Sequence, residues 1–478
     1  MAVLSNLEPK GVFHFFEKIC SIPHGSGNTK AISDYLVNFA KSKNLEVYQD
    51  DADNVIIIKE ASNGYENCRP VILQSHIDMV CEKEADCTKD MATEAIELVL
   101  DGDLISAKGT TLGADNGIGA AYALAVLDND SINHPRIEAV FTSDEEVGML
   151  GAFAIDVSPL KAKTMLNLDC GCEKVFTVSC AGGITSKSTF EIKREEYKHD
   201  TLKITISGLD GGHSGVMIDR GGANSNALMG RLLCELDTKV DIRIAHIEGG
   251  FKDNAIPVET TSVIVTADSG LCKSVISKAL ENYKNEYSLT DANLNVTVTE
   301  ADYTVPMDKE SGKRILAFLS MVPTGVLTMS KQIENLVQTS VNFAIINTFD
   351  TTFEAIHSAR SSVDSQKYDV ADRLAYFTKY LGGKVEVNGD YPGWEFKTES
   401  DLRKCLSEVV VSEFGEEPVF EAVHAGLECG LFSGKIPGLD CVSYGPDMWD
   451  VHTPRERLSV SSVKNVWKIL CEFLKKYK

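Results

Sequence analysis

The sequence predicts an α/β fold: a mixed, mostly parallel sheet flanked by helices, interrupted by an inserted α+β domain. Through residue 185, short apolar strand-like segments alternate with helix-like segments, the pattern of a mainly parallel sheet. After that point the strands alternate apolar and polar positions, and the pattern of alternating apolar strands and helices returns near residue 389. Because an insertion is tolerated where its two crossing points lie close together, we expect a first domain from 1–185 and 389–478, with 186–388 inserted.

The elements of the first domain follow from its apolar runs. Segment 69–78 is apolar at Val71, Ile72 and Leu73 and then becomes polar. This pattern is typical of a buried parallel strand with functional residues at its C-terminal end. Residues 5–43 are predicted to be helical, with a break at 23–27 where the sequence is Pro-His-Gly-Ser-Gly. The remaining expected strands are 54–60, the start of 137–148, 164–171 and 441–446, and the remaining expected helices are 112–127 and 459–477.

The inserted domain is predicted to consist of two successive α+β halves, 186–300 and 301–388. The similarity between the halves lies in their pattern, because no residue-level repeat is found. The expected strands are 202–209, 241–250, 260–267, 340–349 and 352–363, and the expected helices are 222–238, 310–321 and 365–381. Segment 383–394 contains Gly and Pro and is expected to be the return to the first domain.

Composition and charge exclude several functions. The chain has 478 residues, with 47 Lys and Arg against 70 Asp and Glu, a formal net charge of −23. This excess of negative charge argues against nucleic acid and against anionic membranes as partners. The first twenty residues carry charges where a signal peptide would need its apolar stretch, and no apolar run approaches a membrane span. The thirteen cysteines are odd in number and include no CxxC pair, so we expect free thiols and a cytoplasmic protein.

Histidines and carboxylates recur at the ends of the predicted strands of the first domain and in its C-terminal part. They are His76, Asp78, Asp115, Asp144, Glu145, Glu146, Asp169 and His452. Nitrogen and oxygen donors of this kind bind zinc when cysteine is absent, and in open α/β sheets ligands bind beyond the carboxyl ends of the strands. The number of donors fits two metal ions that share one aspartate.

Each of these residues alone has an ordinary explanation. His76 and His452 would be structural or surface histidines, Asp115 a helix-terminal charge, the 144–146 run a solvated loop, and Asp169 a turn residue. Their recurrence at the ends of apolar stretches makes the joint ordinary explanation improbable. The three cysteines near these motifs, Cys81, Cys170 and Cys172, are expected to be small buried fillers and not ligands.

The ordered motifs resemble those of the di-zinc peptidases of the aminoacylase and carboxypeptidase G clan. The matching segments are SHIDMV, GADNGIG, TSDEEVG, LNLDCG and, in the inserted domain, GLDGGHSG. HIDMVCEK, GTTLGADNGIG, HAGLECG and PDMWDVHTPRE are similar to the aminoacyl-histidine dipeptidase branch of the clan. The resemblance covers essentially the whole chain. It implies a zinc-exopeptidase fold with a lid domain and two Zn²⁺ per chain, for which Mn²⁺ or Co²⁺ can substitute.

The resemblance also implies roles for the motif residues of the first domain. One zinc would be held by His76, Asp115 and Asp169, and the other by Asp115, Glu146 and His452, with Asp115 as the bridge. Asp78 would accept the second N–H of the His76 imidazole and fix its tautomer. Glu145 would be the general base that takes a proton from the attacking water and passes it to the leaving amine. Neighbouring carboxylates on an extended segment point in different directions, which would separate the roles of Glu145 and Glu146.

Further residues would meet the substrate. His213 would stabilise the tetrahedral oxyanion, and Arg360 would bind the substrate carboxylate as a bidentate fork. Asn254 would be an additional contact, Gly426 would present its backbone, and Glu428 would receive a free amino group, although an ordinary structural carboxylate explains Glu428 equally well. The second half of the insertion is expected to take the place of a partner's lid, so that His213 acts in the active site of its own chain. Formation of a homodimer for other reasons is compatible with this expectation.

The resulting functional prediction is hydrolysis of dipeptides, with a preference for Xaa-His substrates of the carnosine type that comes from the resemblance only. The alternatives are a broad di- or tripeptidase, an N-acyl amino acid hydrolase of the same clan, and a non-catalytic metal-binding scaffold. The scaffold is disfavoured because the base Glu145 and every expected ligand are present.

Overall fold

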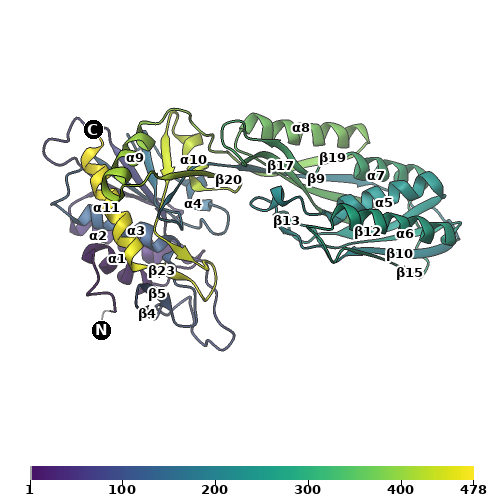
Figure 1. The fold of residues 1–478 in the computed structure, drawn as a ribbon, viewed down its shortest axis with the longest axis horizontal. Coiled ribbons are helices and arrows are strands. Elements are labelled where there is room, and N and C mark those ends of the chain that lie inside the picture. Colours follow the sequence, from purple (N-terminus) through teal and green to yellow (C-terminus); the bar gives the residue numbers. More distant parts are fainter. Residues whose placement is uncertain (1–2) are drawn as a thin grey trace. The chain divides into compact units, whose positions relative to one another are not determined.

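The computed structural model describes residues 3–478 of the chain. The chain divides into two compact units. The first comprises the chain up to Ser179 together with Phe396–Ala422 and Leu427–Lys478, and the second comprises Cys180–Glu395 and Val423–Gly426. Figure 1 shows both units with many of their elements labelled.

The first unit contains an eight-stranded sheet of order β1-β2-β6-β3-β7-β21-β8-β20. The strands are β1 (Glu46–Gln49), β2 (Val55–Lys59), β3 (Val71–His76), β6 (Ile137–Thr142), β7 (Thr164–Asn167), β8 (Val175–Cys180), β20 (Val419–Val423) and β21 (Asp440–Ser443). The four central strands, β6, β3, β7 and β21, are parallel, and β1, β2 and β8 pair antiparallel outside them. The predicted mixed α/β fold is confirmed, and its parallel part is the centre of the sheet.

Helices bury this sheet because its strands are apolar on both faces. All of Val55 to Ile58 in β2 are buried, as are Val71 to Leu73 in β3. The main core is formed with residues of five helices. They are α1 (Lys10–Cys20), α2 (Lys30–Ser42), α3 (Ala114–Asp128), α9 (Asp401–Phe414) and α11 (Val460–Lys476). The shorter α4 (Leu150–Ala154) and α10 (Glu428–Lys435) contact each other.

A second, four-stranded sheet of the first unit links segments that are far apart in sequence. Its order is β22-β23-β5-β4, with β4 (Leu98–Asp101), β5 (Leu104–Ala107), β22 (Met448–Trp449) and β23 (Arg457–Ser459). Leu458 of β23 is paired with Ile105 of β5. This pairing places the loop between β22 and β23, which carries His452, beside the segment that leads to Asp115.

The second unit is built on a nine-stranded sheet. The path runs β15-β10-β14-β12-β17-β18-β9-β19, and β16 pairs with β17. The strands are β9 (Gly182–Glu191), β10 (Asp200–Ser207), β12 (Ile242–Gly249), β14 (Thr260–Thr266), β15 (Asn295–Glu300), β16 (Gly325–Met329), β17 (Val337–Thr348), β18 (Thr352–Ser361) and β19 (Lys384–Tyr391). A short ribbon of β11 (Gly212–His213) and β13 (Ala255–Ile256) stands apart from this sheet.

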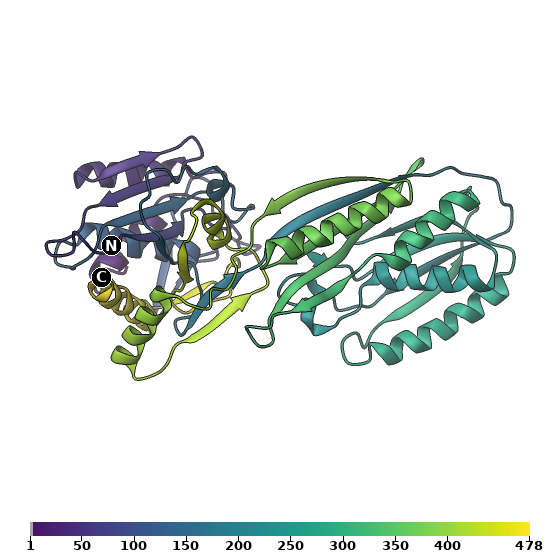
Figure 2. The same cartoon turned by 90° about the horizontal axis from the view of Figure 1, so that it is seen from above.

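Four longer helices of the second unit lie along one face of its sheet (Figures 1 and 2). They are α5 (Ser225–Lys239), α6 (Ser269–Glu286), α7 (Lys309–Met321) and α8 (Asp364–Tyr380), and a short 3₁₀ turn, Ile218–Arg220, precedes them. In β10 the apolar residues Leu202, Ile204 and Ile206 are fully buried in the core with these helices, whereas Lys203 between them is exposed. The alternating pattern therefore marks a sheet that is apolar on one face only.

The unit boundaries differ from the expected 185/186 and 388/389. β9 is one continuous strand that pairs with β18 and β19 over its length, so all of it belongs to the inserted unit. Segment 383–394, expected to be a simple return, contains β19 of the same sheet. Residues 423–426 also belong to this unit, because the Ala181 N–H donates to the carbonyls of Val423 and Ala425 at 3.2 and 3.0 Å.

The two expected halves are joined into one sheet, where β12 pairs with β17 through two residues only. They are not strictly successive, because β9 pairs with strands of the second half and α7 packs against α5 of the first. Within residues 3–478, no helix combines the length and the apolar character needed to cross a bilayer.

Candidate metal centre

Three parallel strands place candidate ligands at one edge of the sheet. His76 ends β3, Glu146 follows β6 and Asp169 follows β7, and these strands are neighbours with the same direction. Asp115 enters from the start of α3, where it and Asn116 depart from helical φ and ψ angles. His452 enters from the loop between β22 and β23. The chain therefore converges on this edge from five separate segments.

Asp115 lies between the two histidines. Its Oδ1 is 3.3 Å from His76 Nε2, and its Oδ2 is 3.3 Å from His452 Nε2. Asp169 Oδ1 is 3.6 Å from His76 Nε2, and Glu146 Oε1 is 2.9 Å from His452 Nε2. The donors thus form two groups that share Asp115, one with His76 and Asp169 and the other with Glu146 and His452.

The pKa shifts in the cluster indicate closely packed negative charge. Burial alone would lower the pKa of His76, but the carboxylates of Asp169 and Asp115 raise it well above its usual value. Hydrogen bonds to Asp115 and Glu146 raise the pKa of His452 to about 10. Burial, with the charge of Asp115, raises the pKa of Asp169 to about 6. Carboxylates packed this densely are stabilised by a bound cation.

The donor set fits a divalent metal. One ligand atom each from His76, Asp115 and Glu146 lies within 4.8 Å of the others. Imidazole nitrogen and carboxylate oxygen are zinc ligands, and manganese accepts the same carboxylates. Asp115 is an acidic residue in the first turn of α3 but not its cap, because no side chain caps α3, and its carboxylate faces the two histidines.

Asp78 contacts the His76 ring and has further partners that the sequence did not indicate. His76 Nδ1 is 3.0 Å from the backbone carbonyl of Asp78 and 3.4 Å from its carboxylate. The carboxylate accepts hydrogen bonds from the Ser26 hydroxyl at 2.7 Å and from the backbone N–H groups of Glu145 and Glu146 at 2.9 and 3.3 Å. Asp78 therefore orients the His76 ring mainly through its backbone and holds the acidic loop through its side chain.

Glu145 and Glu146 lie where the backbone enters a turn and not on an extended segment, contrary to the expectation. Asp144 before them has φ +51°, and a turn begins at Glu146. Glu146 reaches His452, and both glutamates are half-buried. Burial raises the pKa of Glu145 well above its usual value; the charge of His76 opposes this rise, and Asp169 adds to it. A carboxyl group with a raised pKa is suited to carrying protons near neutral pH.

In the second unit, the ring of His213 has a defined hydrogen-bonding direction. Its Nδ1 accepts from the N–H groups of Gly215 and Val216 at 3.1 and 3.3 Å. Burial, with the charge of Arg360, lowers the pKa of His213, so the ring is neutral near pH 7. With Nδ1 as the acceptor, Nε2 carries the proton and is a donor. His213 pairs with Ala255 in the β11–β13 ribbon, next to the exposed Asn254.

Arg360 lies on β18 in the same unit. Its Nη1 donates to the Tyr391 hydroxyl at 3.0 Å, and its buried Nε has no hydrogen-bond acceptor among residues 3–478. The Tyr391 ring packs tightly against Gly426, where a Cβ would come within 2.9 Å of it. The second unit thus brings Arg360 close to Gly426 through Tyr391, a residue to which the sequence assigned no role.

Glu428, at the start of α10 in the first unit, is fully buried. Its Oε2 accepts hydrogen bonds from Gln74 Nε2 at 2.5 Å and from Thr142 Oγ1 at 2.8 Å. Burial raises the pKa of Glu428 to about 7. Its other oxygen, Oε1, is buried and has no hydrogen-bond partner among residues 3–478, so the contact with a substrate amine stays a prediction.

Two other expectations near the site have clear outcomes. Cys81 and Cys172 are exposed and Cys170 is partly exposed, so the prediction that they are buried fillers is wrong. None of the cysteines is in a disulfide.

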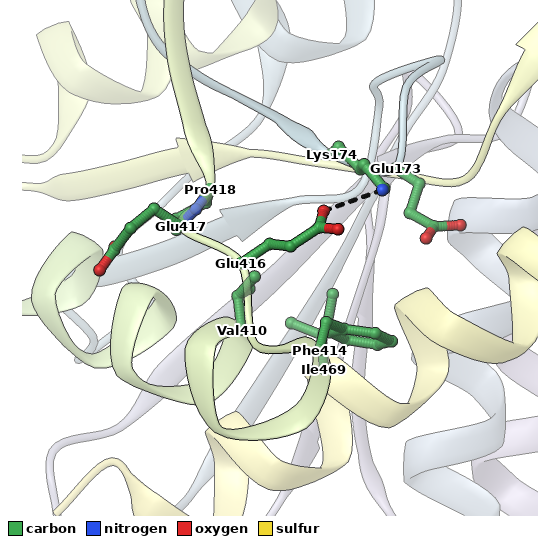
Figure 3. Close-up of a pocket in the computed structure, with 8 residues that line it drawn as sticks. All are labelled: Glu173, Lys174, Val410, Phe414, Glu416, Glu417, Pro418 and Ile469. Carbon is green, nitrogen blue, oxygen red and sulfur yellow. Dashed lines mark hydrogen bonds and ion pairs between the residues drawn. The ribbon is translucent and has the colours of Figure 1, made fainter.

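The pocket drawn in Figure 3 lies elsewhere in the first unit, beside the ion pair of Lys174 and Glu416, and none of the predicted site residues lines it.

The chain is similar to known peptidases over nearly its whole length. It is 37% identical over 480 residues to the cytosol non-specific dipeptidase of Escherichia coli (strain K12), covering 99% of each chain. The crystal structure of aminoacylhistidine dipeptidase from Vibrio alginolyticus superposes with a TM-score of 0.94 at 36% identity, covering 99% of this chain and 98% of that one.

A more distant structure shares the fold alone. It is that of aminopeptidase PepT from Bacillus cereus ATCC 10987, with a TM-score of 0.57 at 16% identity, covering 98% of this chain and 99% of that one. Residues 72–476 match peptidase family M20/M25/M40, a span that includes every candidate ligand. The chain therefore belongs to peptidase family M20/M25/M40 and is a metal-dependent hydrolase.

Proposed function

We propose that this protein is a dipeptidase whose metal centre holds two divalent ions, with zinc as the preferred metal. The observation that carries the proposal is the position of Asp115, with one carboxylate oxygen 3.3 Å from each histidine. His76 and Asp169 would complete one site, and Glu146 and His452 the other. When bound, the metal supplies Lewis acidity and makes a water nucleophilic near neutral pH.

Glu145 would move the proton in this reaction. Its backbone is held by Asp78, and its carboxylate is free of the contacts by which Glu146 reaches His452. Glu145 would accept a proton from the attacking water and donate it to the nitrogen of the departing amino acid. The carboxylate is then regenerated for the next cycle, and no other titratable group is needed for the transfer.

His213 is proposed to donate a hydrogen bond from Nε2 to the oxyanion. Changing His213 to Ala removes this donor, so we expect kcat to fall about 10²–10³-fold, the usual cost of losing one oxyanion donor. KM and metal content should change little, because the residue contacts none of the ligands by hydrogen bond. Steady-state kinetics and metal analysis of the variant test this, and an unchanged kcat would exclude the role.

The chain that His213 serves can be tested by mixing variants. His213→Ala and Glu145→Ala chains would be unfolded together and reassociated. If each chain uses its own His213, as the sequence predicts, the mixture stays inactive. Recovery of activity would require that subunits share the residue.

The substrate is proposed to be a short peptide with a free amino group. Both names of the near relatives are those of dipeptidases, one non-specific and one for aminoacylhistidine. Arg360 is proposed to bind the substrate carboxylate, and Asn254 and Gly426 to contact the peptide. The preference for Xaa-His remains a proposal, and a broad dipeptidase is the second candidate because the E. coli relative is named non-specific. The same relative is named a cytosol enzyme, which supports a cytoplasmic location.

A substrate panel separates these candidates. The metal-loaded protein would be assayed with β-Ala-His, Gly-Gly, a tripeptide and N-acetyl-His. A preference for β-Ala-His supports the Xaa-His assignment, and equal rates on β-Ala-His and Gly-Gly support the broad dipeptidase. Cleavage of N-acetyl-His without cleavage of any free dipeptide would contradict both and indicate an N-acyl amino acid hydrolase.

A further inference from the structure

Glu456 is a buried carboxylate that holds the segment leading into Asp115. It is 2% exposed. Its Oε2 accepts from the N–H groups of Leu112 and Gly113 at 2.7 and 3.0 Å. Its Oε1 accepts from those of Ala114 and Asp115 at 2.8 and 3.3 Å. Four successive backbone donors therefore converge on one side chain.

The backbone of this segment is shaped to receive an anion. Gly113 has φ +70°, and successive N–H groups point to a common centre where the backbone passes through the left-handed region. A side chain at this position would also meet Met79 Sδ at 2.7 Å. The carboxylate of Glu456 occupies that centre, so the direction of the 112–115 segment depends on it.

Glu456 belongs to the same loop as His452. His452 itself has φ +62°, and such a conformation in a non-glycine residue persists only where the surroundings enforce it. The loop is closed by hydrogen bonds from the Glu456 N–H to the Thr453 carbonyl at 3.1 Å and from Thr453 Oγ1 to the Asp450 carbonyl at 2.8 Å. One end of Glu456 is thus fixed to the His452 loop and the other to the Asp115 segment.

We infer that Glu456 is a positioning residue of the metal centre, which sets the separation of Asp115 and His452. The inference rests on the proposed metal centre. Glu456 makes no hydrogen bond to the side chain of any proposed ligand and is not proposed to contact substrate. It acts through two backbone segments, 112–115 and the His452 loop. Residues that orient metal ligands typically change metal affinity about 10–100-fold when they are replaced.

A matched control exists in the same unit. Glu138 on β6 is also fully buried. It accepts hydrogen bonds from the N–H groups of Lys161 and Ala162 at 3.0 Å each and from Arg136 Nε at 2.9 Å. The loop that it holds carries none of the proposed ligands. Glu138→Gln therefore reproduces the loss of a buried carboxylate that binds backbone donors, without touching the metal centre.

The test compares Zn²⁺ binding to metal-free wild type, Glu456→Gln, Glu456→Asp and Glu138→Gln by calorimetric titration. The Gln side chain offers one acceptor oxygen to four donors, so we expect its Zn²⁺ affinity to fall about 10–100-fold. Asp keeps the charge with a shorter reach and should be intermediate. Glu138→Gln should bind as the wild type does, even where its melting temperature falls. Co²⁺ absorption should change for the Glu456 variants only.

The outcomes are distinguishable. If wild type binds Zn²⁺ and both Glu456 variants bind it equally tightly with an unchanged Co²⁺ spectrum, the positioning role is overturned while the metal centre stands. If Glu138→Gln loses affinity to the same extent, the effect is general destabilisation and the inference is again overturned. If wild type itself binds no divalent metal, the proposed function fails and the inference fails with it.

Discussion

Changing Glu145 to Gln should lower kcat for dipeptide hydrolysis by about 10²–10⁴-fold, the contribution expected of a general base. The amide is nearly isosteric but cannot accept the proton of the attacking water. Glu145 lies outside the pairs of atoms that join Asp115 to the two histidines, so the variant should still bind two metal ions. Steady-state kinetics with metal analysis of the same sample would measure both effects.

The neighbouring Glu146 is the matched control. Its Oε1 lies 2.9 Å from His452 Nε2, so Glu146→Gln should weaken metal binding and recover part of its activity in excess Zn²⁺. Excess metal should not rescue Glu145→Gln. A Glu145→Gln enzyme that retained more than about a tenth of wild-type kcat would contradict its role, because even the smallest expected effect is larger than that.

Changing Asp115 to Asn should remove both metal ions together and abolish hydrolysis. Its two carboxylate oxygens face different histidines, and an amide offers only one oxygen. Of the two histidines, Asp169 is paired with His76, so Asp169→Asn should weaken one site only. After dialysis, metal analysis should find two ions per chain in wild type, about one in Asp169→Asn and none in Asp115→Asn.

Stability provides a second measure of the same loss. A metal present at 100 times its Kd stabilises the folded wild type by about 2.7 kcal/mol through binding alone. Denaturant unfolding with and without Zn²⁺ should show this increment for wild type and not for Asp115→Asn. Retention of both ions in Asp115→Asn would contradict the bridging role.

The part of the fold and site that the sequence predicts depends on local pattern. The apolar run of β3 ends in His76, and the runs of β6 and β7 lead to Glu146 and Asp169. Because parallel neighbours end at the same edge, strand pattern alone brings these residues together. His452 follows no long strand; the sequence groups it with the others as a histidine of the C-terminal part, and its place in a ligand set came from the resemblance of the motifs.

The remainder depends on contacts between distant segments, which leave no periodic signal. Glu456 binds the Leu112 N–H across 344 positions of sequence, and nothing in its own neighbourhood indicates a buried carboxylate. The partners of Asp78 are set by the turn after β6. The nine-stranded sheet of the second unit is likewise fixed by pairing, since β9 precedes its partner β18 by more than 150 residues.

Bound divalent metal should enable this chain to hydrolyse a free dipeptide, and a metal titration of the stripped protein would measure this dependence. The protein would be stripped with a chelator, and hydrolysis of β-Ala-His and Gly-Gly would be followed as Zn²⁺ is added. We expect no activity without metal, and activity that rises with added Zn²⁺ and saturates at two equivalents per chain. Undiminished activity in the stripped protein, or no cleavage of either dipeptide at saturation, would contradict this expectation.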